Sequence, residues 1–354
     1  MLLEPQSMCW LEGRKVARRD GPTWARSFAR FPLLEYVVCD GGTGLHAGID
    51  QVRTQRREAG NPRALERGLD VFHTLRDGRR ALRATWREVS RAIERAESLD
   101  RRMASRAWHG KSLQGHGGAA GAAWRVAETC WDRATAIEAA WNQARSALEL
   151  FTSAGRLMTR SAAEAILADA IPRLAGEEWD KTRRTLKRGE TLTFLDRVER
   201  GLAELSLPAE TLAAILSLEG ARRARSGTDP SPTGAAHGLA LVRMVQLSKL
   251  DQNWRESVTR VRQVLRNAWR ASSLVECLNS VARMQQARHR KMTPGLLDLK
   301  RLYWNLRRFR TGRRKGKTPY DLLGLSLPAL SWWELLKMPP ERLRQLLSAS
   351  ALGP

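Results

Sequence analysis

Asp40 and Glu276 are the two carboxylates whose surroundings suit chemistry on a phosphate. Asp40 follows an apolar run, residues 33–39 (LLEYVVC), which predicts a buried strand, and two glycines come directly after it. Ligands of open α/β sheets bind beyond the carboxyl ends of the strands, and glycines let a backbone approach closely. The simpler interpretation is that Asp-Gly-Gly is only a turn between a strand and a helix.

Glu276 lies in a helix predicted over residues 272–286, which begins at two serines. On such a helix Asn279 and Arg283 share its face through i+3 and i+7 spacing, which suits a metal ligand beside a phosphate. Residues 277–317 hold 13 Lys or Arg and a single acid, so we expect this region to attract a polyanion. The alternative is a solvated polar helix face.

Two carboxylates held in one cleft are a typical site for Mg²⁺ or Mn²⁺, which activates water or a 3′ hydroxyl for in-line displacement at a phosphodiester. Asp70 and His73, at the end of a second strand predicted over 69–72, are the supporting candidates. His73 would hydrogen-bond a carboxylate or a phosphate, and Asp70 would orient it or cap the strand. A histidine with a purely structural role at a strand end is an equally good interpretation.

The charge of the chain indicates an acidic partner. The 354 residues carry 61 Lys or Arg against 37 Asp or Glu, a formal net charge of +24, and 51 of the 61 cations are Arg. Arginine binds phosphate through two parallel hydrogen bonds, so nucleic acid is the first candidate partner. Tyr303 and Trp304 lie among these cations and would stack on bases or pack in the core. The predicted DNA-binding residues are Arg288, Arg290, Lys291, Lys300, Arg301, Arg307, Arg308, Arg313, Arg314, Lys315 and Lys317.

The chain is expected to be mostly helical overall, with an α/β part at its beginning. Residues 1–75 read as α/β, residues 76–270 as all-helical, residues 271–330 as the helix of Glu276 with a basic helical tail, and residues 331–354 as a carboxy-terminal tail. No apolar run approaches the 18 or so residues that a membrane span needs. Four scattered cysteines favour a reducing cytosol over a disulfide framework or a zinc site.

Several blocks resemble those of bacterial insertion-sequence DDE transposases. Residues 37–45 (VVCDGGTGL) and 274–280 (LVECLNS) are similar to the second-Asp and final-Glu blocks, and 70–73 (DVFH) to an Asp/Cys-x-x-His block. Residues 286–305 and 316–325 look like the tail of the same enzymes. The resemblance implies an α/β ribonuclease-H-like core with a large all-α insertion between its parts, and Asp40 and Glu276 as Mg²⁺ or Mn²⁺ ligands. It also implies double-stranded DNA as partner (transposon ends and target), a homodimer on DNA, and a bacterial cytoplasm at the nucleoid.

One part of the family pattern is missing from the sequence. The resemblance places a first catalytic Asp on the first strand of the core, upstream of a Glu-Pro-x-Ser segment that residues 4–7 (EPQS) resemble, whereas this sequence begins at Met1. We therefore expect an incomplete core, as in an amino-terminally truncated transposase or a remnant of one. The alternative is a non-catalytic, basic helical DNA-binding protein.

Overall fold

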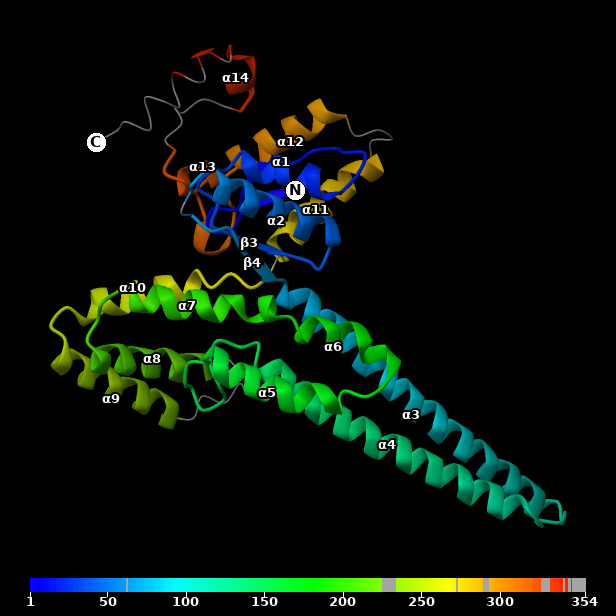
Figure 1. Ribbon diagram of the computed structural model, residues 1–354. Helices are drawn as coiled ribbons and strands as arrows, with labels where there is room; N and C mark the ends of the chain where they lie inside the picture. The colour runs from blue at the N-terminus through cyan, green and yellow to red at the C-terminus, as the bar shows by residue number, and fades with distance from the viewer. Residues whose placement is uncertain are drawn as a thin grey trace. The chain divides into compact units, whose positions relative to one another are not determined.

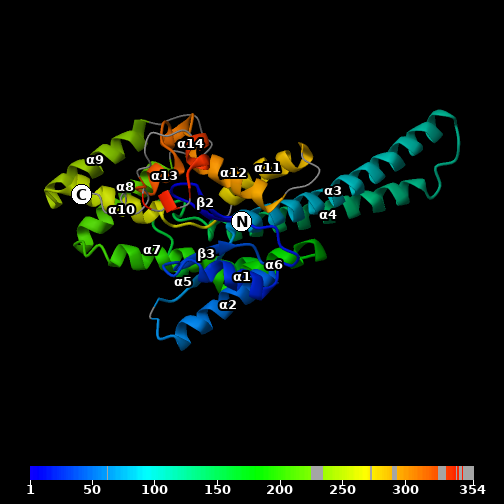
Figure 2. The same ribbon diagram turned by 90° about the horizontal axis from the view of Figure 1, so that it is seen from above.

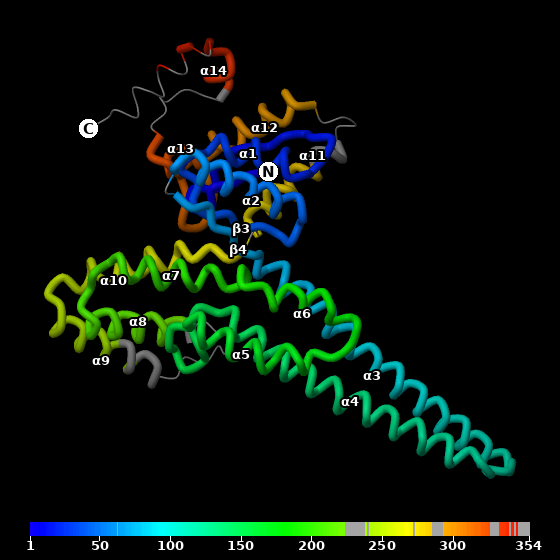
Figure 3. Tube along the Cα trace, viewed as in Figure 1, coloured from blue at the N-terminus to red at the C-terminus, as the bar shows by residue number. Residues whose placement is uncertain are grey.

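The computed structural model describes residues 1–61, 63–224, 234–271, 273–288, 293–325, 332–339, 341–342 and 345. The chain is mostly helical, as predicted, with 69% helix and 6% strand in small sheets. It divides into two compact units, which we call the mixed unit (Met1–Glu66 with Ala271–Pro354) and the helical unit (Arg67–Arg270) (Figure 1). The tube in Figure 3 shows the blue amino-terminal and the orange carboxy-terminal segments within the mixed unit.

The mixed unit begins with a β-hairpin. Strands β1 (Leu2–Glu4) and β2 (Cys9–Glu12) are antiparallel, with Leu3 opposite Trp10 and Glu4 opposite Cys9. The Glu4 carboxylate accepts hydrogen bonds from the backbone N–H groups of Gln6 (2.8 Å) and Ser7 (2.7 Å). Residues 4–7 therefore form a turn that the Glu4 side chain stabilises locally.

A β–α–β segment follows the hairpin. Helix α1 (Gly21–Ala29) leads to strand β3 (Tyr36–Cys39), helix α2 (Thr43–Glu58) and strand β4 (Glu66–Leu69). The N–H of Glu66 donates to the carbonyl of Glu35 at 2.7 Å, so β3 and β4 start side by side and run in the same direction. In the described part of the chain these two strands form one two-stranded sheet, and β1 with β2 forms another.

Helices cover both faces of β1. Leu2 packs with α1 and α2 in a core that also contains Val37 and Cys39 of β3. Leu3, one residue further along, points into a second core with Leu278 and side chains of the carboxy-terminal helices. Successive residues of a strand point to opposite faces, so this alternation defines a helix–sheet–helix layering.

The second helical layer comes from the far end of the chain. It consists of α11 (Ser273–Arg288) and α12 (Pro294–Leu306), which lie near the hairpin in both ribbon views and contact it (Figure 2). Residues 312–322 follow as the short turn η3 (Gly312–Arg314) and helix α13 (Pro319–Leu322), with α14 (Trp332–Lys337) near the end.

Side chains of α12 complete the outer edge of β2. Asn305 accepts from the N–H of Trp10 (2.8 Å) and donates to its carbonyl (3.1 Å), like a neighbouring strand. The Trp304 indole donates to the carbonyl of Met8 (2.8 Å) and Arg301 to that of Leu11 (3.2 Å). The edge strand is thereby protected, because buried backbone groups need partners.

The helical unit is built on a long antiparallel hairpin of α3 (Val71–Trp108) and α4 (His116–Ser146), whose far end extends beyond the other helices of the unit in Figures 1 and 2. One continuous core joins the base of this hairpin to the rest of the unit. The other elements are α5 (Arg160–Arg173), η1 (Glu177–Trp179), α6 (Asp180–Leu186), η2 (Gly189–Leu192), α7 (Thr193–Ala203), α8 (Ala209–Ala224), α9 (Gly234–Leu250) and α10 (Trp254–Arg266).

The two ends of the helical unit are tied together. The N–H of Val71 donates to the carbonyl of Arg270 at 2.8 Å. Because the unit starts and finishes at the same place, it is arranged as an insertion between the two segments of the mixed unit.

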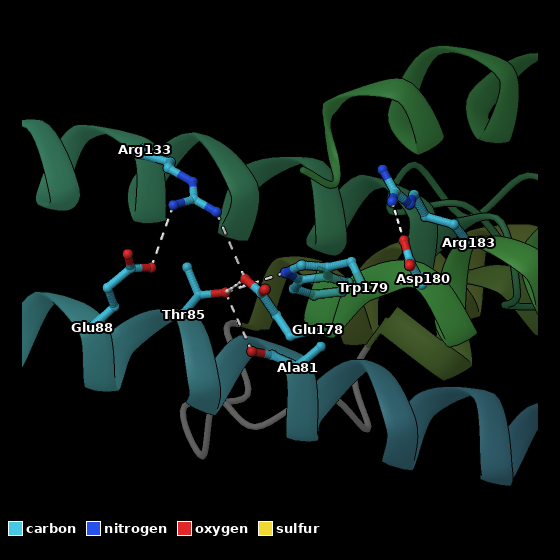
Figure 4. Close-up of polar contacts among 8 residues, drawn as sticks. All are labelled: Ala81, Thr85, Glu88, Arg133, Glu178, Trp179, Asp180 and Arg183. Carbon is cyan, nitrogen blue, oxygen red and sulfur yellow. Dashed lines mark hydrogen bonds and ion pairs between the residues drawn. The ribbon is translucent and has the colours of Figure 1, made fainter. Parts of the chain in front are cut away.

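The tryptophans of α3 and α4 are buried at the base of the hairpin and exposed toward its tip. Trp141 of α4 and Trp179 of η1 are both fully buried, and their rings pack together with centroids 5.5 Å apart. The Trp179 indole donates a hydrogen bond to the hydroxyl of Thr85 on α3 (Figure 4). Trp131 and Trp124, which lie on the same periodic stripe of α4 as Trp141, are about half and one third exposed. The outer part of the hairpin buries small side chains such as Ala96, Ala120 and Ala127 but does not fully cover a ring as large as tryptophan.

No helix among the described residues is long and apolar enough to cross a bilayer. The longest, α3, carries an arginine in nearly every turn between Arg76 and Arg95. Charges at this density would be costly in a hydrocarbon core.

Candidate active site and its basic surroundings

Asp40 is the first residue after β3, at the carboxyl end of the strand, as predicted. Its side chain is exposed, and one carboxylate oxygen accepts a hydrogen bond from the N–H of Gly42 at 3.2 Å. Gly42 is the residue that precedes α2. The Asp-Gly-Gly segment thus forms the strand-to-helix turn and also presents a carboxylate to solvent.

Gly44, in the same block, has a packing role. A Cβ atom at this position would overlap the backbone carbonyl of Arg19, just before α1. The close approach of the chain before α1 to α2 therefore requires glycine at position 44. A cradle for phosphate is not needed to explain this residue.

Glu276 lies in the first turn of α11, whose apolar residues Leu274, Leu278 and Val281 pack in the core shared with Leu3. Glu276 is half-buried, so it lies at the border of the packed face.

The residues predicted to share a polar face of α11 differ in their exposure to solvent. Asn279 is half-buried like Glu276, whereas Arg283 is exposed. Glu276 and Asn279 thus lie at the border of the helix face that covers the sheet, and Arg283 is presented to solvent.

Asp40 and Glu276 both belong to the mixed unit, although the whole helical unit lies between them in the sequence. Their donor set is two carboxylates, and Mg²⁺ is commonly held by one or two carboxylates together with water and substrate phosphates. Within the described ranges, no three His, Cys, Asp or Glu side chains gather into a group that could hold a metal ion. As residue types, two carboxylates suit Mg²⁺ or Mn²⁺, and a complete site would need further ligands.

The strand predicted over 69–72 is wrong beyond Leu69, because Asp70 is the N-cap of α3. One Asp70 oxygen accepts from the N–H groups of Phe72 (2.7 Å) and His73 (3.3 Å), and the other lies 2.5 Å from Nδ1 of His73. An aspartate that binds the free N–H groups of a first helical turn stabilises the helix start. Asp70 and His73 therefore have a structural role at the start of the helical unit.

Three of the predicted DNA-binding arginines bind backbone carbonyls. Arg301 donates to Leu11, Arg308 to Gly316 (2.6 Å), and Arg314 to both Pro5 and Gln6 (2.9 Å each). Burial lowers the pKa of Arg314. Arg301 thus ties α12 to β2, Arg308 makes its contact within the loop 307–317, and Arg314 anchors this loop to the turn 4–7.

The other predicted cations of this region lie at or near the surface. Arg313, Lys315 and Lys317 are exposed, and Lys300 is half-buried. Arg307 is exposed and lies 4.0 Å from the centroid of the buried Trp304 ring, a cation–π contact. Arg288 is the last residue of α11, and Arg290 and Lys291 lie outside the described residues.

Of the two aromatic residues in α12, Trp304 is core and Tyr303 is half-exposed. Asn305, which sequence reasoning did not single out, is only 1% exposed. Its signal in the sequence is weak: a polar residue directly after a tryptophan that occupies the apolar face of the helix.

Comparisons with protein-family models, curated proteins and solved structures find no match to this chain. The resemblance of residues 37–45 and 274–280 to transposase blocks therefore stays a prediction.

Proposed function

We propose that the mixed unit is the ribonuclease-H-like core of a DDE-type transposase, which binds double-stranded DNA and performs Mg²⁺-dependent strand cleavage and transfer. One observation carries the proposal. Residues 1–66 and the segment from 271 onward fold into one unit around a helical insertion, with Asp40 at the end of β3 and Glu276 on the helix that covers β1. A strand end and a covering helix are the places that the resemblance assigns to the second Asp and the final Glu.

The two small sheets of the mixed unit support the proposal of a core with a sheet layer. The resemblance places one further strand, with the first Asp, ahead of the segment 4–7. Each described sheet has two strands, and both sheets contribute to the core under α1 and α2 through Leu2 and Val37.

In this proposal Asp40 and Glu276 hold the metal, and the exposed cations of residues 300–317 bind the DNA backbone. Mg²⁺ or Mn²⁺, when bound, would activate the attacking water or 3′ hydroxyl and stabilise charge on the phosphodiester. Arg313, Lys315 and Lys317 would place the strand through phosphate contacts, which fix position and carry no sequence information.

A plasmid-nicking assay tests the catalytic part. Purified protein is incubated with supercoiled plasmid and Mg²⁺ or Mn²⁺, and relaxed and linear DNA are separated on a gel. We expect metal-dependent nicking to fall at least about tenfold in Asp40→Asn and Glu276→Gln, equivalent to about 1.4 kcal/mol in the barrier. Both changes remove a charge and keep the side-chain shape.

Glu58→Gln and Asp298→Asn are the matched controls, since both residues are exposed acids of the mixed unit outside the pair. They should nick as well as the wild type. Nicking that survives in Asp40→Asn and Glu276→Gln would remove these residues from the mechanism. If the wild type shows no metal-dependent nicking, this chain does not cleave DNA and the catalytic proposal fails.

The second candidate function is non-catalytic DNA binding, and the exposed cations after α12 favour it. We expect Arg313→Ala/Lys315→Ala/Lys317→Ala to weaken binding to all duplex sequences alike and to flatten the slope of log K against log salt by about 3. Arg314 is kept, because it anchors the loop. Fluorescence anisotropy over a salt series measures both quantities, and a flat salt dependence of the wild type would contradict phosphate binding.

A further inference from the structure

Helix α3 carries five arginines along one face, which we call the arginine row: Arg76, Arg80, Arg83, Arg87 and Arg91. Their spacings of three and four residues keep them on a single stripe of an α-helix. At 1.5 Å per residue the row is about 22 Å long. All five side chains are exposed.

The row lies opposite the packed face of α3. The buried residues of this stretch, Thr74, Gly78, Ala81, Thr85 and Val89, also recur every three or four positions, about half a turn away. In Figure 4, Ala81 and Thr85 lie on the side of α3 that faces Trp179 and Glu178, and the Thr85 hydroxyl donates to Glu178 (3.2 Å). The row therefore faces away from the core of the helical unit.

Two of the acids near the row are paired with cations from other helices. Asp77 binds the Lys181 ammonium at 2.8 Å, and Glu88 binds Arg133 of α4 at 3.3 Å (Figure 4). Among the described residues, no member of the row has an ion pair or a side-chain hydrogen bond. The five arginines thus lie on one helix face without an ion-pair partner in the part of the chain that the structure describes, and Glu94, an exposed acid, continues their stripe one turn beyond Arg91.

Duplex nucleic acid is the partner that fits this arrangement. B-form DNA carries one charge per 1.7 Å or so of its axis, so about 13 phosphates lie along the length of the row. A straight helix supplies cations at regular intervals along a straight polyanion, and arginine forms paired hydrogen bonds with phosphate.

A membrane surface fits poorly. Helices that bind at a bilayer interface insert large apolar side chains next to their cations. The large apolar side chains that are exposed on α3 are Phe72 and Trp108, at its two ends, and neither lies within the row.

We propose that the arginine row binds the phosphate backbone of duplex nucleic acid, as a second contact surface separate from the cations of the mixed unit. The inference concerns α3 alone and does not depend on Asp40 or Glu276. Both surfaces would contribute to the affinity of the full chain, and variants separate them.

The test compares two four-residue variants of the full chain with equal charge. The row variant is Arg80→Glu/Arg83→Glu/Arg87→Glu/Arg91→Glu. The control variant changes four exposed arginines of the same unit outside the row, Arg125→Glu/Arg145→Glu/Arg156→Glu/Arg188→Glu. Affinity for a fluorescent duplex of about 30 base pairs is measured over a salt series, where each lost phosphate contact removes about 0.9 from the slope.

We expect the row variant to bind the duplex at least tenfold more weakly than the control variant does. Its slope of log K against log salt should also be smaller than that of the control variant by about 3 to 4. A row variant with glutamine, Arg80→Gln/Arg83→Gln/Arg87→Gln/Arg91→Gln, should also bind the duplex more weakly than the control variant, with a smaller loss of affinity than the glutamate variant. Circular dichroism checks that each variant is folded. Equal binding by row and control variants would overturn the inference, whatever the variant at 313–317 does. Loss of binding to phosphatidylserine vesicles with unchanged duplex binding would also overturn it, in favour of a membrane.

Discussion

Replacing Asn305 by alanine is expected to lower the free energy of unfolding of the mixed unit by about 2–6 kcal/mol. The Asn305 amide pairs with both backbone groups of Trp10, and both residues are buried. Its removal leaves a buried N–H and a buried carbonyl without partners, at a cost of about 1–3 kcal/mol each. Hydrogen exchange of peptides from residues 1–12, read by mass spectrometry, measures this loss within the mixed unit alone.

Asn279→Ala serves as the control, because Asn279 is half-buried at a helix surface and should change stability by less than about 0.5 kcal/mol. Asn305→Asp separates the two hydrogen bonds, since an ionised carboxylate still accepts from the N–H of Trp10 but cannot donate to its carbonyl. We expect this variant to be at least as unstable as Asn305→Ala. Exchange in the hairpin that stays at the wild-type rate would show that α12 does not hold the edge of β2.

Periodicity and turn residues predicted much of the local structure. The helix expected over 272–286 is α11 (Ser273–Arg288), and the strand expected over 33–39 is β3 (Tyr36–Cys39). These segments carry their own signals, namely a 3.6-residue apolar period or a run of β-branched residues that ends at Asp-Gly-Gly. The mostly helical class of the chain follows from the same local patterns.

Around Asp70 the local sequence pattern fits both a short strand and the start of a helix. Leu69, Val71 and Phe72 read as a short apolar strand, but an aspartate directly before a long 3.6-residue period is also a typical N-cap. The helix prevailed because Asp70 satisfies the N–H groups of the first turn, and α3 continues for 38 residues. Sequence reasoning placed the strand end three residues too late.

Roles that depend on distant partners could not be predicted from the sequence. Arg313 and Arg314 are adjacent members of one basic run, yet Arg314 binds carbonyls of the turn 4–7 and Arg313 is exposed. Trp131 and Trp141 belong to one stripe of α4, yet Trp131 is half-exposed, whereas Trp141 is buried against Trp179. Burial in these cases is set by packing between segments, which a helical period does not encode.

Gly78 packs against Trp141, and this contact should reverse the stabilisation that usually results when a glycine within a helix is replaced by alanine. Trp141 is 1% exposed, and a Cβ at Gly78 would overlap its ring. The ring has no free space to move into, because Trp179 lies against it. Gly78→Ala should therefore destabilise the helical unit by about 1–3 kcal/mol through overpacking, although alanine in a helix is ordinarily about 1 kcal/mol better than glycine.

Trp141→Ala alone should cost about 3–5 kcal/mol, as for other buried tryptophans. In that background the added methyl group at position 78 meets no ring, so Gly78→Ala should stabilise by up to about 1 kcal/mol. A double-mutant cycle followed by hydrogen exchange in α3 and α4 measures the coupling. If Gly78→Ala has the same effect with and without Trp141, the glycine is not there to admit the indole, and the close packing at the base of the hairpin must have another cause.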